Sequence, residues 1–239
     1  GLIEIVGEEI DKEYKKMAGQ GLRVLAFSKL PAQQKKGIEK MEKDMEFLGL
    51  IGIADSPRME AKAAIEKARS AGISTVMITG DNELTAKAIA LEIGLMREGD
   101  EVLTGSQLNE LTEEELKLRI EKIRIFARAL PDHKLRIVKA YQALGKIVAV
   151  TGDGVNDSLA LKQAHVGVAM GKTGTDVAKE ASDIVILDDN LSTIVTAVEE
   201  GRLIYANILK VVKFLMTGNF SEILVIAGAA ALGLPIPLS

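Results

Sequence analysis

Short apolar runs alternate with longer amphipathic stretches over most of the chain. Dense apolar runs bounded by polar residues or glycine are typical of strands buried on both faces, and the clearest are Ile123–Ala127 and Ile147–Val150. Apolar residues at helical spacing predict helices over Glu8–Gly19, Met59–Ala71 and Pro131–Leu144. Further strands are predicted at Leu22–Leu30, Phe47–Ala54, Ser74–Ile78, Val166–Ala169 and Ile184–Leu187. This alternation predicts an α/β fold with one parallel sheet, covered by helices on both faces, from about Phe47 to Asp189.

The pattern changes in the last section of the chain. Ser192 to Phe214 has the pattern of a long helix without proline, and Phe214–Leu234 is then apolar over about the ~20 residues that a bilayer requires. This segment contains Asn219 and Glu222, which share one helix face because they lie three residues apart. An acid inside an apolar helix is costly. We therefore predict a stalk that continues into a membrane helix with two ion-facing oxygen groups; a buried core helix is the alternative.

Composition excludes several classes of function. The chain has 239 residues, 47% of them hydrophobic, which is enough for a sizeable core, and a net charge of −4 with only 3% aromatic residues. Scattered basic residues and few aromatics argue against a nucleic-acid partner. The absence of cysteine excludes disulfides and thiolate chemistry. The first residue is glycine, without an initiator methionine or a signal-peptide pattern, so we expect the chain to be cut from a longer one.

Two predicted strands end in the same polar turn. Ile147–Val150 is followed by Thr151-Gly152-Asp153-Gly154, and Ser74–Ile78 by Thr79-Gly80-Asp81-Asn82. In the first turn Asn156 is placed to cap the next helix, and the carboxylates of Asp153 and Asp157 can point at one place. Glycine turns, helix starts and paired acids at strand ends favour a site for phosphate plus a hard cation. Solvated turns with capping acids are the alternative.

The two histidines are poorer candidates for chemistry. His133 is expected to be exposed at a helix start, and His165 to be packed or in a loop. Neither has a cysteine or a second histidine at metal-ligand spacing.

An ordered set of motifs resembles the carboxy-terminal part of the large cytoplasmic region of P-type cation-transporting ATPases. The matching stretches are Asp55-Ser56-Pro57-Arg58, Met77–Asn82, Phe126-Ala127-Arg128, Pro131–Lys134, Thr151–Asp157, Val168–Gly171 and Ala181–Asn190. The resemblance covers nearly the whole chain, and it implies a haloacid-dehalogenase-like (Rossmann-like) sheet together with Mg²⁺, ATP and a transported cation. It also implies an integral membrane protein, with this part mostly on the cytoplasmic side, whose partners are the bilayer and the pump's remaining domains.

The resemblance assigns roles to individual residues. The catalytic residues that it implies are Thr79, Gly80, Asp81, Lys134, Asp153, Asn156 and Asp157. In the family, Asp153 corresponds to the aspartate that holds Mg²⁺, Thr79 to a hydrogen-bond donor to the transferred phosphoryl group, and Lys134 to the cation that neutralises it. Charge neutralisation and fixed donors are what phosphoryl transfer requires.

Nucleotide, hinge and ion residues are implied in the same way. Those implied to bind nucleotide are Arg23, Arg128, Thr79, Gly80 and Asp81. Asp55 and Arg58 match the family's hinge motif, although Ser56 stands where proline is usual. Asn219 and Glu222 are similar to the ion ligands of calcium pumps, and a sodium- or proton-transporting pump is the alternative.

Other parts of the family's machinery are not in this sequence. The family's phosphorylated aspartate lies in Asp-Lys-Thr-Gly-Thr, and Lys172-Thr173-Gly174-Thr175 lacks the nucleophile because Gly171 precedes it. We predict a remnant of the nucleotide-binding domain at 1–46, the phosphorylation domain without its aspartate at 47–191, and a stalk and transmembrane helix at 192–239. The chain alone is therefore expected to be inactive.

Two readings from other classes remain open. A soluble haloacid-dehalogenase-type phosphatase would use Asp55 as its nucleophile, but Pro57 stands where an acid or threonine is general. A regulatory or scaffolding fragment would not need Lys134, Asp153 and Asp157 together.

Overall fold

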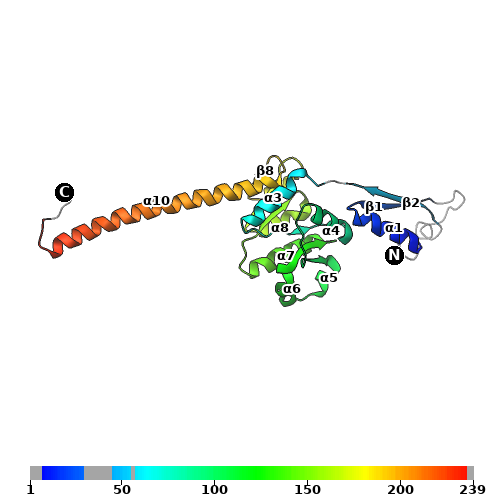
Figure 1. The fold of residues 1–239 in the computed structure, drawn as a ribbon, viewed down its shortest axis with the longest axis horizontal. Coiled ribbons are helices and arrows are strands. Elements are labelled where there is room, and N and C mark those ends of the chain that lie inside the picture. Colours follow the sequence, from blue (N-terminus) through cyan, green and yellow to red (C-terminus); the bar gives the residue numbers. More distant parts are fainter. Residues whose placement is uncertain (1–6, 30–44, 55–56, 236–239) are drawn as a thin grey trace. The chain divides into compact units, whose positions relative to one another are not determined.

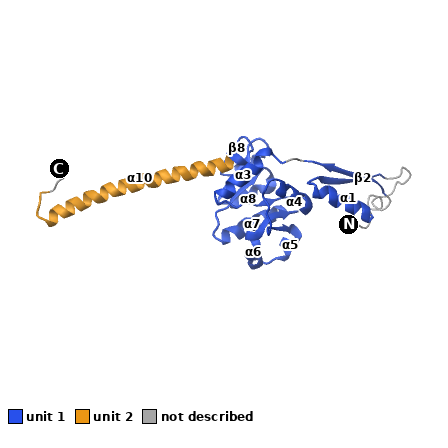
Figure 2. Ribbon diagram, viewed as in Figure 1, with its two compact units in different colours: residues 1–192 blue, residues 193–239 orange. Residues whose placement is uncertain are grey.

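The computed structural model describes residues 7–29, 45–54 and 57–235, which form two compact units dividing between Ser192 and Thr193 (Figures 1 and 2). The strands are β1 (Arg23–Lys29), β2 (Glu46–Ile53), β3 (Met77–Ile78), β4 (Glu101–Thr104), β5 (Ile123–Ala127), β6 (Ala149–Gly152), β7 (Val166–Met170) and β8 (Ile184–Ile186). The helices are α1 (Glu8–Gly19), α3 (Met59–Ser70), α4 (Glu83–Glu92), α5 (Gly105–Glu110), α6 (Glu113–Arg119), α7 (Pro131–Ala143), α8 (Ser158–Gln163), α9 (Asp176–Glu180) and α10 (Leu191–Ala231), with short 3₁₀ turns η2 (Ile120–Lys122) and η3 (Val155–Asp157).

The first parallel sheet has the order β3-β5-β4 and is covered on both faces. On one face Phe126 packs in a cluster with residues of α5, α6 and α7, and on the other Ile125 and Ala127 pack against α3 and α4. Burial on both faces explains why β5 is an uninterrupted apolar strand apart from Arg124. Each large side chain buried there, such as Phe126, contributes about 1.5–3 kcal/mol.

The second parallel sheet has the order β6-β7-β8. Its core is smaller and is formed by Leu161, Ala169 and Ala178, with Val150 and Ala181 packed against it. The predicted buried run Ile147–Val150 is displaced along the chain, because β6 spans Ala149–Gly152 and Ile147 is 80% exposed.

The α/β class and the parallel pairing are confirmed, but the prediction of one continuous sheet is not. Among the described strands, β3 and β6 each have a hydrogen-bonded neighbour on one side, β5 and β7 respectively. The two sheets are connected through helices: Gln142 of α7 and Gln163 of α8 are joined by hydrogen bonds.

The strand predicted at Phe47–Ala54 is present, but the prediction that it is buried is wrong. The strand exists as β2, but it pairs antiparallel with β1 in a two-stranded sheet of its own, and Leu48 and Ile51 are more than half exposed. Alternating apolar residues predict a strand without naming its partner, and here the partner is the preceding strand.

The second unit consists of α10 beyond Ser192 and the residues that follow it. The helix runs without interruption to Ala231, so the predicted stalk and apolar segment form one element. Its most apolar segment has a mean hydropathy of 1.5, which by length and composition is enough to cross a membrane.

Candidate functional site

The strand β6 ends in the turn that the sequence singled out, and Asp157 holds this turn together. Its carboxylate accepts hydrogen bonds from the backbone N–H groups of Asp153 (3.3 Å) and Gly154 (3.1 Å). Because Gly152 lies against the same side chain, an added Cβ there would stand 2.8 Å from Asp157 Cγ and closer still to Asp157 Cβ. The turn therefore requires glycine at 152.

A partly buried ion pair joins this turn to α7. The Lys134 ammonium group donates to Asp157 Oδ1, and the two side chains are 23% and 7% exposed. A carboxylate with this little exposure is stable only when its oxygens are hydrogen-bonded to cations or N–H groups, and Asp157 has both kinds of partner. Two predicted site residues that lie 23 positions apart are thus brought into direct contact.

Asp153 and Asp157 have different surroundings, and the prediction that both carboxylates point at one place stays a prediction. Asp157 is buried and engaged by Lys134, whereas Asp153 and Asn156 are exposed. The helix cap predicted for Asn156 is not observed, because Asp157 is the residue that precedes α8 and no side chain caps that helix. The side chain that accepts the backbone hydrogen bonds of this turn, Asp157, is also the buried one.

Oxygen donors in this turn fit a magnesium ion. Mg²⁺ in proteins is typically held by one or two carboxylates and keeps several waters or substrate phosphates, so an exposed Asp153 beside the Asn156 amide is a suitable donor set. Within the described residues no group of three or more acidic, histidine or cysteine side chains converges on one point. The site therefore suits an ion held jointly with a phosphate ligand.

The second turn, at the end of β3, is closed by hydrogen bonds within the turn and by hydrogen bonds from the loop after β5. The Thr79 hydroxyl donates to Asp81 Oδ2 (2.9 Å) and accepts from the Asp81 N–H (3.1 Å). The backbone N–H groups of Arg128 and Ala129 donate to the carbonyls of Asp81 (3.0 Å) and Thr79 (2.9 Å). Arg128 has φ +49°, a left-handed conformation that is costly for a side chain with a Cβ and that recurs at functional sites.

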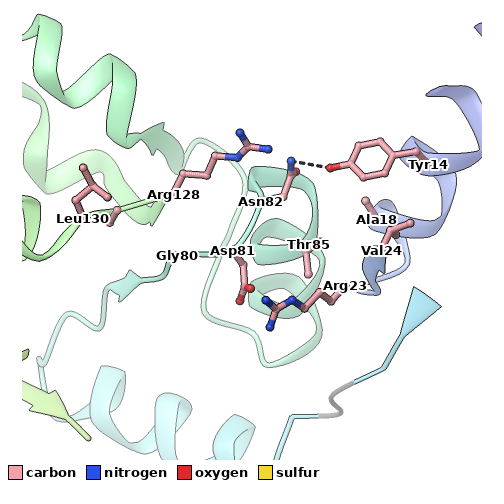
Figure 3. Close-up of a pocket in the computed structure, with 11 residues that line it drawn as sticks. Tyr14, Ala18, Arg23, Val24, Gly80, Asp81, Asn82, Thr85, Arg128 and Leu130 are labelled. Atoms are coloured by element: carbon pink, nitrogen blue, oxygen red, sulfur yellow. Dashed lines mark hydrogen bonds between the residues drawn. The ribbon is translucent and has the colours of Figure 1, made fainter. Parts of the chain in front are cut away.

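A pocket of about 480 Å³ opens beside this turn (Figure 3). Its lining includes Arg23 from β1, Gly80 and Asp81 from the turn, and Arg128 from the loop after β5. The volume lies in the range of small-molecule sites, and the two guanidinium groups and the backbone of a glycine turn suit a phosphate-bearing ligand. Four of the five residues implied to bind nucleotide therefore line one pocket.

Asn82 connects the wall of the pocket to α1 through a hydrogen bond. Its Oδ1 accepts from the N–H of Leu84 (2.9 Å), which caps α4, and its Nδ2 donates to the Tyr14 hydroxyl (2.9 Å; Figure 3). Thr85 adds a bond from its hydroxyl to the Leu22 carbonyl (3.1 Å). A polar residue directly before a helix is a recognisable capping signal, but the contact with Tyr14 has no signal in the sequence.

The sites at β3 and β6 are linked through α7 but do not share this pocket. Lys134 and Asp153 are not among the residues that line it. The predicted convergence of Thr79, Lys134 and Asp153 on a single spot stays a prediction. Lys134 contacts Asp157, which accepts the Asp153 N–H, and the Thr79 carbonyl accepts the N–H of Ala129, shortly before α7.

The structure describes one of the two residues predicted for the hinge, and the hinge role itself stays a prediction. Arg58, at the start of α3, donates to the backbone carbonyl of Asp189; Asp55 lies outside the described residues. The Asp189 carboxylate accepts from the N–H groups of Gly171 (2.6 Å), Lys172 (3.0 Å) and Thr173 (2.8 Å) and from the Thr173 hydroxyl (2.9 Å).

Asp189 was not predicted to have a role, although it closes the glycine-rich loop after β7. Burial of the Asp189 carboxyl raises its pKa, but these four hydrogen bonds together outweigh burial and lower the pKa to about 2. Like Arg128, it has a positive φ, +54°. An acidic run after a strand was the available signal, but it did not distinguish Asp189 from Asp188.

The two parallel sheets and the polar turns at their strand ends define a class of protein. The chain belongs to the haloacid dehalogenase-like hydrolase family, whose model matches residues 3–165.

Relatives with assigned activities extend the match over the whole chain. It is 51% identical to a calcium-transporting ATPase of Bacillus subtilis over 96% of this chain and 26% of that protein. It is 46% identical to calcium-transporting ATPase 1 of Saccharomyces cerevisiae over 93% and 24%, and 45% identical to the cation-transporting ATPase pma1 of Synechocystis over 99% and 27%. The predicted resemblance to P-type pumps is confirmed, and the chain spans about a quarter of the length of these relatives.

Proposed function

We propose that this chain is part of an ATP-driven calcium pump that works through an aspartyl-phosphate intermediate, and that it supplies the Mg²⁺ and phosphate site. The observation that carries the proposal is the partly buried Lys134–Asp157 pair, which fixes a cation on the turn that carries the exposed Asp153 at the end of β6. A fixed cation and an exposed carboxylate in one turn at the carboxyl end of a parallel strand suit phosphoryl transfer.

The free edges of β3 and β6 support an assignment for the nucleophile. Each strand lies at the edge of its sheet in the described part of the chain, and each ends in a Thr-Gly-Asp turn. We assign the strand that bears the family's Asp-Lys-Thr-Gly-Thr aspartate to the position between these edges, where it would pair with both. This order would bring Thr79, Lys134 and Asp153 around one phosphoryl group.

The remaining roles follow from this arrangement. Mg²⁺ held at Asp153, with Asn156 beside it, would neutralise charge on the phosphate. Lys134 would neutralise the transferred group, and Thr79 would donate to it after turning away from Asp81, its present partner. Arg23 and Arg128 would hold the phosphates of ATP in the pocket that they line.

The ion and the membrane belong to the same proposal. Residues 1–46, 47–191 and 192–239 would serve as a nucleotide-domain remnant, the phosphorylation domain and the coupling helix, with the first two on the cytoplasmic side. Asn219 and Glu222 offer hard oxygen ligands on one face of α10, which suit Ca²⁺. The names of the Bacillus and Saccharomyces relatives favour calcium over sodium or protons.

A chimera tests the proposal directly. The matching segment of the Bacillus subtilis ATPase is replaced by this chain, and membranes are incubated with labelled ATP, Mg²⁺ and Ca²⁺. We expect an acid-stable, hydroxylamine-sensitive label that requires Ca²⁺, and its loss in D153N but not in D176N, which removes an exposed acid from the first turn of α9. The isolated chain should form no such label. Normal labelling of the D153N chimera, or labelling of the isolated chain, would contradict the proposal.

A further inference from the structure

His133 is the third residue of α7 and its imidazole is buried, contrary to the exposure expected from the sequence; the residue is 6% exposed. Both ring nitrogens have partners: Nδ1 accepts from the backbone N–H of Leu130 (3.1 Å), and Nε2 lies 2.8 Å from Asn109 Oδ1. An Nδ1 that accepts cannot carry a proton, so the geometry assigns the neutral ring with its proton on Nε2, donated to Asn109.

The bond to Leu130 is a helix cap made from the third position. The same contact occurs at two other helices of this protein, where Gln107 accepts from the N–H of Thr104 (2.9 Å) and Glu115 from that of Thr112 (2.8 Å). Glutamine and glutamate are the usual residues for this reciprocal cap. At α7 a neutral imidazole replaces them, and its second nitrogen adds a tie to α5 that a carboxylate, lacking an N–H, would not supply.

The ring also lies against the loop that carries Arg128. A Cβ added to Gly105 would stand 2.8 Å from His133 Cε1, and the Arg128 carbonyl oxygen lies against the same face of Gly105. One residue further along α7, Lys134 reaches Asp157. His133 therefore belongs to the short segment from Arg128 to Lys134, which contains both of the proposed phosphate-binding cations.

We propose that His133 is a positioning residue for the phosphate site: by accepting the Leu130 N–H it fixes the start of α7, and with it the Lys134 ammonium group on Asp157. The purpose of this positioning, which is phosphate binding by Lys134, rests on the proposed function. The positioning itself is a property of this chain and is tested without turnover.

The test compares two substitutions with opposite properties. H133Q keeps an acceptor that can cap Leu130, as Gln107 does for Thr104, whereas H133L keeps apolar volume and loses the acceptor. The full chain in detergent is treated with acetic anhydride, and acetylation of Lys134 is measured by mass spectrometry against Lys139, an exposed lysine on the same helix. H165L is the matched control, because His165 Nδ1 also accepts a backbone N–H, from Val148 at 3.1 Å, near the other end of β6.

We expect H133L to raise the Lys134 to Lys139 acetylation ratio on the order of fivefold, as loss of a helix cap does to a local equilibrium. H133Q and H165L should leave the ratio near the wild-type value. A purely packing role predicts the reverse order, with leucine better tolerated than glutamine, and that result would overturn the proposal. So would equal ratios in H133Q and H133L.

A second measurement stands independently of whether H133L folds. Long-range ¹H–¹⁵N spectra of the wild-type imidazole should show Nδ1 unprotonated and Nε2 protonated, and a proton on Nδ1 would overturn the proposal. Binding of MgATP is measured on the same variants. If the wild-type chain binds none, the proposed function is weakened while the acetylation ratios still decide the role of His133; if it binds, affinity should fall in H133L and persist in H133Q.

Discussion

Gly152 offers the sharpest test of how the magnesium turn is built. A Cβ at this position would overlap Asp157 at the root of its side chain, where Cγ is 2.8 Å away and Cβ closer, so rotation of the carboxylate cannot relieve the clash. In G152A the carboxylate must withdraw from the N–H groups of Asp153 and Gly154 and from Lys134.

The expected magnitude follows from these losses. Overpacking costs about 1–3 kcal/mol, and each hydrogen bond to a charged group is worth ~1.5–3 kcal/mol, only part of which is lost when water can enter. We expect G152A to destabilise the chain by about 2–4 kcal/mol. In a domain of this size each kcal/mol lowers Tm by about 2–4 °C, so the fall should be roughly 4–16 °C.

Gly154 provides the matched control in the same turn. Its φ is −112°, and an added Cβ would meet nothing closer than Asp157 Oδ2 at 3.6 Å. G154A should therefore stay within about 0.5 kcal/mol of the wild type. Scanning calorimetry of the full chain in detergent micelles measures both variants. If G152A and G154A have the same Tm, Asp157 does not hold the turn as described.

Three further predictions concern other parts of the chain. The folded pKa of Asp189 is about 2, below its ordinary value of 3.8. Its contribution to stability should be complete above about pH 4 and lost as pH falls toward 2, so acid titration of D189N should show a weaker dependence across that window. In the chimera, E222Q should weaken Ca²⁺-dependent labelling while E200Q leaves it unchanged; equal responses would remove Glu222 from the ion site. The chain should not hydrolyse p-nitrophenyl phosphate, and turnover that vanishes in D55N would favour the phosphatase alternative instead.

Periodicity predicted the individual elements of this fold well. The helix predicted at Glu8–Gly19 agrees at both ends with α1, and the strand predicted at Ile123–Ala127 agrees with β5. It missed β4, because Glu101–Thr104 has only two apolar residues between a polar turn and a helix cap. In an edge strand of four residues, pairing with β5 rather than side-chain pattern decides the structure.

Contacts between distant segments could be predicted only where a family motif carried them. Lys134 and Asp157 were placed at one site by resemblance, but nothing in their spacing indicates a direct ion pair. The partnership of Arg58 with the Asp189 carbonyl and the burial of His133 were missed for the same reason. Each depends on which strands become neighbours, and local sequence does not encode that order.

The two turns next to the proposed phosphate share a physical design that explains which polar residues remain available to a ligand. At the start of α7 and after β6, a side chain three residues into the turn accepts the leading N–H: His133 for Leu130, and Asp157 for Gly154. His133 and Asp157 are both buried, and neither can turn toward a ligand without breaking its turn. Their neighbours are thereby held in position with their own groups exposed, as Asp153 is. Substituting His133 or Asp157 should therefore displace the ligand-binding groups, whereas substituting Asp153 should remove a ligand from an intact turn.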